Sequence, residues 1–249
     1  MSKLLQVKIL TLFPELFPGP LDLSITGRAL KNKIWSLETI DIRSFASDKH
    51  RTVDGPIVGG GTGMILRPDI IADAIDYAKA GSDDFTVIYM SPRGEKLTQR
   101  LSEKFSKKQN KLIIICGRFE GIDQRVIDHY SIKEISIGDY ILTGGEIAAY
   151  VFLDSCIRLL PGVLSDSSVF TEESFGSELN KSQEKTYRNL LEYPQYTKPI
   201  SWKNRAVPDI LLSGHHENIK KWNLEQAEKY TETRRPDLWK LYKKNNKLS

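Results

Sequence analysis

The chain of 249 residues has little cysteine and histidine, and it has no long apolar run. Only Cys116 and Cys156 are present, both in apolar surroundings, so we expect buried reduced thiols and no disulfide scaffold. The four histidines, among them His215 and His216, do not have the spacing of a zinc site. No apolar stretch approaches the roughly 20 residues of a membrane span, and the first residues lack the pattern of a secretory signal. We therefore expect a cytoplasmic protein with no membrane segment and no assignable metal ligands.

Two phosphate-binding fingerprints are also missing. Segment 48–66 has four glycines between positions 59 and 63, but no lysine follows them, so neither GxxxxGK[ST] nor GxGxxG fits. A dinucleotide-dependent enzyme is therefore the least favoured function. A mobile turn is favoured over a phosphate site here, and a mobile glycine loop beside a crevice can act as a lid.

Three segments share one design, in which a buried strand opens into a turn that contains glycine. They are 85–95 (FTVIYMSPRGE), 111–123 (KLIIICGRFEGID) and 136–146 (SIGDYILTGGE). Because glycine has no Cβ, a flat ligand can lie directly against the backbone of such a turn. Three strand ends of this kind predict an α/β fold with a parallel sheet and one ligand crevice at the carboxyl edge of that sheet.

The rest of the pattern fits the same fold class. Strands are expected at 6–13 and 36–42, and helices at 24–33, 68–80 and 146–160. Helix 68–80 has proline at its first position and an apolar stripe, whereas 146–160 is apolar nearly all round and is predicted to be buried. From 164 the composition turns polar, which indicates a linker. We therefore divide the chain into a domain at 1–163, a flexible linker at 164–186 and a helical domain at 187–249.

The positive charge of the chain is concentrated in its last part. Residues 215–249 hold nine Lys/Arg against five Asp/Glu, an excess that equals the net charge of +4 of the whole chain. Trp222, Tyr230, Trp239 and Tyr242 are interleaved with these cations, and such a mixture suits a phosphate backbone with stackable bases. A solvated helical face with core aromatics explains the same segment equally well.

Nine segments in order resemble the bacterial tRNA (guanine-N1)-methyltransferases, the TrmD family of the SPOUT class. They are FPE at 13–15, GGGTGM, YMSPRGE, CGRFEGID, SIGDYILTGGE, RLLPGVL, YPQYTKP, VPDILLSGHHENI and RRPDL, and the resemblance spans residues 7 to 242. It implies a SPOUT-type parallel sheet whose glycine loops form a C-terminal trefoil knot, followed by a small all-helical domain. It also implies tRNA as substrate and a homodimer whose active site is shared between the subunits.

The resemblance further implies S-adenosyl-L-methionine as methyl donor, bound bent in the knot. Carried onto this sequence, the residues in contact with the cofactor are Tyr89, Ser91, Pro92, Gly117, Glu120, Gly121, Ile137, Gly138, Tyr140, Leu142, Gly144 and Gly145. The crevice expected from the three glycine turns coincides with this set.

The family's reaction, methyl transfer to N1 of the guanosine at tRNA position 37, sets two chemical needs. N1 carries a proton at neutral pH, so a carboxylate must remove it while a cation faces O6. The family has this carboxylate in the linker and an arginine on the preceding helix, and these roles match Glu173 and Arg158. An ordinary ion pair with Asp154, four residues earlier, is the structural alternative for Arg158.

This sequence departs from the family pattern in two places. Glu173 stands where an aspartate is usual, which moves the carboxylate by roughly 1.5 Å, so Glu172 and Asp166 are alternative bases and a solvated linker acid is the structural alternative. The glycine loop has Ile57 and Val58 where an aromatic is usual, and the linker is about a dozen residues longer. Both differences concern the substrate side more than the cofactor pocket.

Two other functions compete with this interpretation. A SPOUT ribose 2′-O-methyltransferase needs no base at N1, and a non-catalytic RNA-binding protein needs no cofactor pocket. The pairing of GxxxGID with IGDYxLTGGE and a linker carboxylate favours the guanine enzyme. A magnesium requirement is not assignable from the sequence.

Overall fold

The protein is described by a computed structural model over residues 4–108, 111–166, 169–176 and 187–246. The chain divides into two compact units, Met1–Ser165 and Asp166–Ser249. Much of the predicted linker, residues 177–186, lies outside the described part of the chain.

The first unit is built on a five-stranded sheet with the strand order β2-β1-β6-β5-β7. Every neighbouring pair is parallel, so the predicted parallel α/β sheet is confirmed. The strands are β1 (Leu5–Thr11), β2 (Trp35–Asp41), β5 (Thr86–Lys96), β6 (Lys111–Ile115) and β7 (Lys133–Ser136). The first strand of the chain lies inside the sheet, where Gln6 of β1 is in register with Lys111 of β6.

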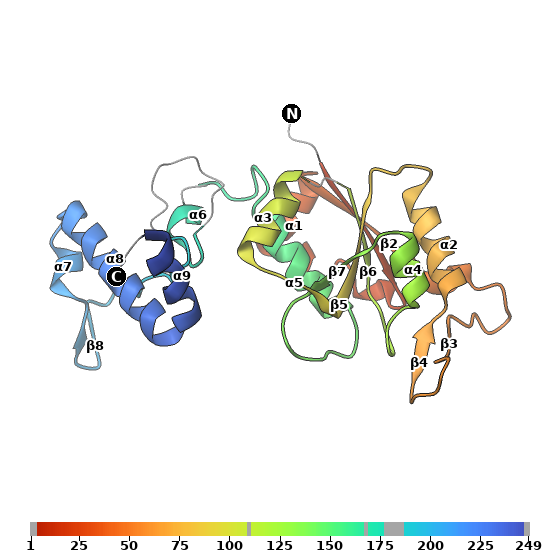
Figure 1. Cartoon of the computed structure of the whole chain (residues 1–249). Helices are drawn as coiled ribbons and strands as arrows, with labels where there is room; N and C mark the ends of the chain where they lie inside the picture. The colour runs from red at the N-terminus through yellow and green to blue at the C-terminus, as the bar shows by residue number, and fades with distance from the viewer. Residues whose placement is uncertain (1–3, 109–110, 167–168, 177–186, 247–249) are drawn as a thin grey trace. The chain divides into compact units, whose positions relative to one another are not determined.

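Helices cover both faces of this sheet (Figure 1). One face carries α1 (Ser24–Lys31), α3 (Gln99–Lys108) and α5 (Glu146–Ile157), and the other carries α2 (Pro68–Lys79) and α4 (Gln124–His129). Because successive strand residues point to opposite faces, β6 contributes Leu112 and Ile114 to one core and Ile113 and Ile115 to the other. A strand buried on both sides reads as a continuous apolar run.

The sequence predictions for helices α2 and α5 of the first unit compare differently with the structure. In α2 the proline lies at the start, as predicted. The residues of its predicted stripe are all buried, namely Ile70, Ile71, Ala74, Ile75 and Ala78. In α5 the prediction of all-round burial is wrong, because Ile147 is 56% exposed and Val151 is 45% exposed. The helix packs on the sheet through one side only, and these two residues, four apart, share the opposite side.

Segment 48–66 is more ordered than the predicted loop. It contains an antiparallel hairpin of β3 (Asp54–Pro56) and β4 (Met64–Leu66). Gly59, Gly60, Gly61 and Gly63 all have positive φ at its tip, which glycine adopts without strain. Strands of three residues are too short for an alternating pattern to reveal. Short 3-10 helices also occur at η1 (Pro14–Leu16), η2 (Gly19–Asp22) and η3 (Ile42–Phe45).

The second unit is mainly helical around a small core. Its elements are α6 (Val169–Glu172), β8 (Ser201–Trp202), β9 (Arg205–Ala206), α7 (Asp209–Leu212), α8 (His216–Arg234) and α9 (Pro236–Asn246). The hairpin of β8 and β9 corrects the prediction of an all-helical domain. Trp239 and Tyr242 stack with ring centroids 5.4 Å apart beside buried Leu190, so these two aromatics serve the core of the unit.

Both cysteines are buried free thiols, as predicted. Burial raises the pKa of Cys156 to about 12, and it also raises the pKa of Cys116. Over the described residues, none of the helices combines the length and the apolar character needed to cross a membrane.

Candidate active site

A pocket opens at the carboxyl ends of β6 and β7, beside the middle of β5. It has about 760 Å³ of space between its walls, counting its open mouth. All the residues predicted to touch a cofactor line it: Tyr89, Ser91, Pro92, Gly117, Glu120, Gly121, Ile137, Gly138, Tyr140, Leu142, Gly144 and Gly145. The three glycine segments, far apart in the sequence, thus form one continuous lining.

The first segment is a bulge inside β5 and not a loop after it. The register between β5 and β7 shifts between Met90 and Glu95, so the residues between them bow out from the ladder. A Cβ at Gly94 would come within 2.3 Å of the backbone of Glu134, which explains the glycine. The bulge exposes Pro92 to the pocket while β5 resumes its pairing afterwards.

The second segment folds over the ring of Tyr89. A Cβ at Gly117 would meet the Tyr89 ring at 2.7 Å, and one at Gly121 would meet its hydroxyl oxygen at the same distance. Tyr89 is itself only 6% exposed, and burial raises its pKa. The two glycines therefore let the backbone settle onto an aromatic side chain that forms part of the pocket wall.

The third segment combines close backbone contact with an exposed apolar rim. The Gly145 amide donates to the carbonyl of Gly117 at 3.0 Å, and a Cβ on Gly145 would lie 2.8 Å from Cα of Cys116. Tyr140 is 54% exposed and Leu142 is 38% exposed at the pocket. The segment offers a tight backbone floor and two apolar side chains that a ligand can cover.

The glycine hairpin of β3 and β4 is attached to this pocket. The Leu66 amide donates to the carbonyl of Gly121, and the Glu120 amide donates to the carbonyl of Met64, both at 2.9 Å. A Cβ on Gly63 would meet the Glu120 side chain at 2.7 Å. The loop that the sequence suggested as a lid is therefore hydrogen-bonded to two residues of the pocket lining.

The pocket also contains residues that the sequence interpretation missed. They are Met90, Arg118, Phe119, Ile135, Ser136, Ile141, Thr143 and Ala148. The most informative is Arg118, whose guanidinium donates to the carbonyl of Thr143 at 3.2 Å and lies 4.4 Å from the ring centroid of Phe13. A charged residue between two glycines in GRFEG was visible in the sequence, but its partners were not.

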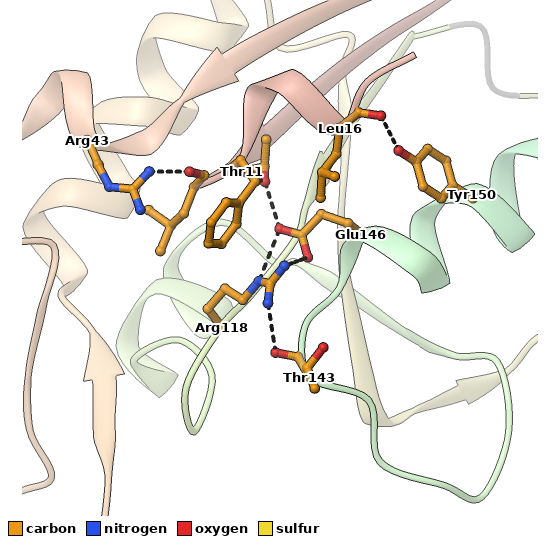
Figure 2. Close-up of polar contacts among 9 residues, drawn as sticks. Thr11, Leu16, Arg43, Arg118, Thr143, Glu146 and Tyr150 are labelled. Atoms are coloured by element: carbon orange, nitrogen blue, oxygen red, sulfur yellow. Dashed lines mark hydrogen bonds and ion pairs between the residues drawn. The ribbon is translucent and has the colours of Figure 1, made fainter. Parts of the chain in front are cut away.

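The principal partner of Arg118 is Glu146, the first residue of α5 and only 1% exposed. Figure 2 shows Arg118 and Thr11 reaching this carboxylate. Thr11 Oγ1 donates to Glu146 Oε1 at 2.7 Å, Arg118 Nε donates to the same oxygen at 3.3 Å, and Arg118 Nη2 lies 3.0 Å from Oε2. The last contact has the distance of an ion pair without hydrogen-bond alignment, so Oε2 has no hydrogen-bond donor.

Comparison with known proteins places this arrangement in a family. The sequence model of the family described as tRNA (Guanine-1)-methyltransferase TrmD matches residues 5–241. The chain belongs to the TrmD family. It is 48% identical over 238 residues to a protein of Ruegeria sp. (strain TM1040) named tRNA (guanine-N(1)-)-methyltransferase, covering 95% of this chain and 93% of that protein.

Further relatives carry the same name. A protein of Pelagibacter ubique (strain HTCC1062) is 49% identical over 240 residues, which cover 96% of this chain and 99% of that protein. A protein of Ehrlichia canis (strain Jake) is 50% identical over 234 residues, covering 94% of this chain and 95% of that protein. The resemblance read from the nine sequence segments is confirmed at the level of the family.

The two residues predicted to act on the substrate in this TrmD-family chain belong to different units. Arg158 is half-buried at the carboxyl end of α5, where its amide donates to the carbonyl of Asp154 at 3.2 Å. Glu173 is half-buried just after α6. Its neighbour Glu172 accepts a hydrogen bond from the Tyr193 hydroxyl at 3.0 Å, which gives Glu172 a structural partner. Asp166, the other alternative base, is exposed.

No cluster of three or more His, Cys, Asp or Glu suited to a metal ion occurs among the residues that the structure describes. Two acids close to the pocket pair with cations. Lys96 Nζ lies 3.6 Å from Asp139, and Arg118 pairs with Glu146.

Proposed function

We propose that this protein transfers a methyl group from S-adenosyl-L-methionine to N1 of the guanosine at tRNA position 37. The observation that carries the proposal is the pocket, because the positions expected to hold the cofactor all line it in a chain of the TrmD family. Such a reaction would place the protein in the cytoplasm, where tRNA is modified.

The pocket's lining fits this cofactor. Its floor is a backbone surface at Gly117, Gly121 and Gly145 that side chains would cover, so a heterocycle can hydrogen-bond to N–H and C=O groups there. Ile137, Tyr140 and Leu142 supply apolar walls. When bound, the sulfonium provides an activated methyl group for a nucleophile.

The nucleophile must be generated by the protein. We assign Glu173 as the base that takes the N1 proton and Arg158 as the cation that faces O6 as charge develops there. Alignment of guanine N1 with the methyl group and exclusion of water from the site further accelerate the transfer. The guanine must leave its stack before either group can act.

The second unit is proposed to bind tRNA, and its hairpin offers the clearest surface. Trp202 is 58% exposed, and Lys203 Nζ lies 4.8 Å from its ring centroid. Lys198 and Arg205 are exposed nearby in the chain, and residues 194–208 contain no acid. Exposed aromatics among unopposed cations suit stacking on bases and contact with phosphates.

We further propose that the chain acts as a homodimer and that the three glycine segments form a trefoil knot. The exposed apolar side of α5, with Ile147 and Val151, supports the first proposal, since such residues favour burial against another surface. The contact of Gly145 with Gly117 supports the second, because it joins the second and third segments through their backbones.

The decisive test is to locate the methyl group. Purified protein is incubated with S-adenosyl-L-methionine and a tRNA transcript, and the digested nucleosides are analysed by mass spectrometry. N1-methylguanosine is expected, and it should disappear when guanosine 37 of the transcript is replaced by adenosine. A ribose 2′-O-methyl product would favour the competing enzyme, and no product together with no cofactor binding would favour an RNA-binding protein.

A further inference from the structure

The charges of the candidate pocket raise a question of selectivity. The charged residues of its lining are the basic Arg118 and the acidic Glu120. Glu120 is exposed to solvent, whereas the Arg118 side chain is only 21% exposed and is held against the floor. Because charges at less hydrated positions are screened less than those in water, Arg118 is the stronger source of potential inside the pocket.

An unopposed arginine would disfavour a cationic ligand. A methyl sulfonium carries a positive charge, while the demethylated thioether left after transfer is neutral at sulfur. A guanidinium in the pocket wall would therefore repel the donor and not the product. The donor is accepted only if this charge is cancelled nearby.

Glu146 is placed to cancel it. Its carboxylate is 1% exposed and lies 3.0 Å from Arg118 Nη2, so the two charges are held together beneath the pocket. The position is fixed from several sides, by Thr11 from β1 and by Arg118 itself, which also donates to Thr143 in the third segment. A Cβ on Gly144 would come within 2.6 Å of both partners, so glycine there lets the pair lie directly under the backbone.

We propose that Glu146 allows the pocket to accept a sulfonium as readily as a neutral thioether, because it neutralises Arg118. This inference rests on the proposed function, since it takes S-adenosyl-L-methionine as the donor. Glu146 is in this view a specificity-determining residue that acts through Arg118 and does not itself touch the donor.

The substitution Glu146→Gln separates charge from geometry. Both hydrogen bonds to the carboxylate end on Oε1, so the amide oxygen of glutamine can accept them from Thr11 and Arg118. Only the oxygen in the ion pair is replaced by an uncharged NH₂ group. This NH₂ group and Arg118 Nη2 are both donors and must move slightly apart, but the bonds of Arg118 to Oε1 and to the Thr143 carbonyl remain. Arg118 therefore stays in the pocket wall and loses its counter-charge.

The experiment is calorimetry of wild type and variants with S-adenosyl-L-methionine and, separately, S-adenosylhomocysteine. In E146Q the dissociation constant for the sulfonium should rise about tenfold more than that for the thioether, the scale for unit charges about 10 Å apart at an effective dielectric constant near 20. The double variant R118Q/E146Q, which has neither charge, should restore the wild-type ratio of the two constants. E146D, which keeps the charge, should also keep that ratio.

Equal weakening of both ligands in E146Q would show a merely structural role and overturn the proposal. If E146Q does not fold, R118Q provides a second test. Loss of the cation should strengthen binding of the sulfonium relative to the thioether. An unchanged ratio of the two dissociation constants would contradict the proposal. A wild-type protein that binds neither ligand would refute the proposed function instead, so the two failures are distinguishable.

Discussion

Gly145 illustrates how a single residue can decide whether two loops meet. Its amide bonds the carbonyl of Gly117, and the space for its Cβ is taken by the backbone of Cys116 at 2.8 Å. Backbone atoms cannot rotate away as a flexible side chain can. The residue is therefore required by the contact between segments and not by an unusual φ of its own.

The first prediction concerns this contact. Gly145→Ala should lower the melting temperature by about 3–10 °C, because forced overpacking costs about 1–3 kcal/mol, and it should weaken cofactor binding by separating the two segments. Thermal melts and calorimetry measure both effects. Gly55→Ala is the matched control, since no atom lies within 4 Å of its Cβ position and its φ is ordinary. Equal melting temperatures for the two variants would contradict the role given to Gly145.

The second prediction concerns the proposed base. Glu173→Gln should slow single-turnover methyl transfer by about 100-fold or more, the usual scale for loss of a general base, while cofactor binding stays near wild type. Rapid quench with labelled donor gives the rate. Glu172→Gln is the control, because Glu172 bonds the Tyr193 hydroxyl and should affect local structure more than chemistry. A near-normal rate of methyl transfer in E173Q would show that another group acts as the base at N1.

At the residue scale, the sequence predicted which residues line the pocket better than it predicted the contacts that support them. Glycine and apolar residues at strand ends are local signals, so those positions could be placed at one edge of the sheet. The pairing of Thr11 with Glu146 spans 135 residues, and no local pattern reveals it. Arg118 was equally hidden, because its partners come from two other parts of the chain, at Phe13 and at 143–146.

At the scale of elements, the hairpin of β8 and β9 is the feature that the sequence pattern did not predict. Its strands have two residues each, and Lys203 and Asn204 adopt positive φ in the turn between them. Four strand residues leave no periodicity to detect. The long elements were predictable because α2 repeats its apolar stripe over three turns and β6 is continuously apolar.

The third prediction tests this hairpin as a tRNA contact. Lys203→Glu with Arg205→Glu should raise KM for tRNA about tenfold and leave kcat nearly unchanged. The salt dependence of binding should fall in slope by about 2 if both cations contact phosphates. Binding titrations at several salt concentrations measure this.

A variant with the same charge change elsewhere is the control for the hairpin test. Arg100→Glu with Lys104→Glu alters two exposed residues of α3 in the first unit. If both variants weaken tRNA binding equally, the effect would be one of net charge, and the hairpin would lose its special role.

At the scale of the whole molecule, the sheet was predictable and the surfaces were not. Alternating burial in the strands follows from the pattern of the sequence, but the exposure of Ile147 and Val151 on α5 does not, since these two residues are as apolar as those of the buried side. The proposed homodimer would bury this exposed apolar side.

The fourth prediction addresses that interface. Ile147→Glu with Val151→Glu should convert a dimer into a monomer in sedimentation experiments at micromolar concentration, because buried unpaired charges oppose association. Methyl transfer should be lost with the dimer if the active site is shared. Tyr77→Glu, on a helix of the opposite face of the sheet and 60% exposed, is the control and should leave the mass unchanged. A double variant that stays dimeric would exclude α5 from the interface.

The position of β1 within the sheet has a consequence for synthesis. This strand is synthesised before the other strands of the sheet, yet its second neighbour, β6, begins only at Lys111, and the carboxylate that Thr11 binds follows at residue 146. Non-local pairings of this length close slowly. β1 can pair early with β2, but it can pair with β6 only after about a hundred further residues have been translated. The ligand crevice can therefore form only after most of the first unit has been translated.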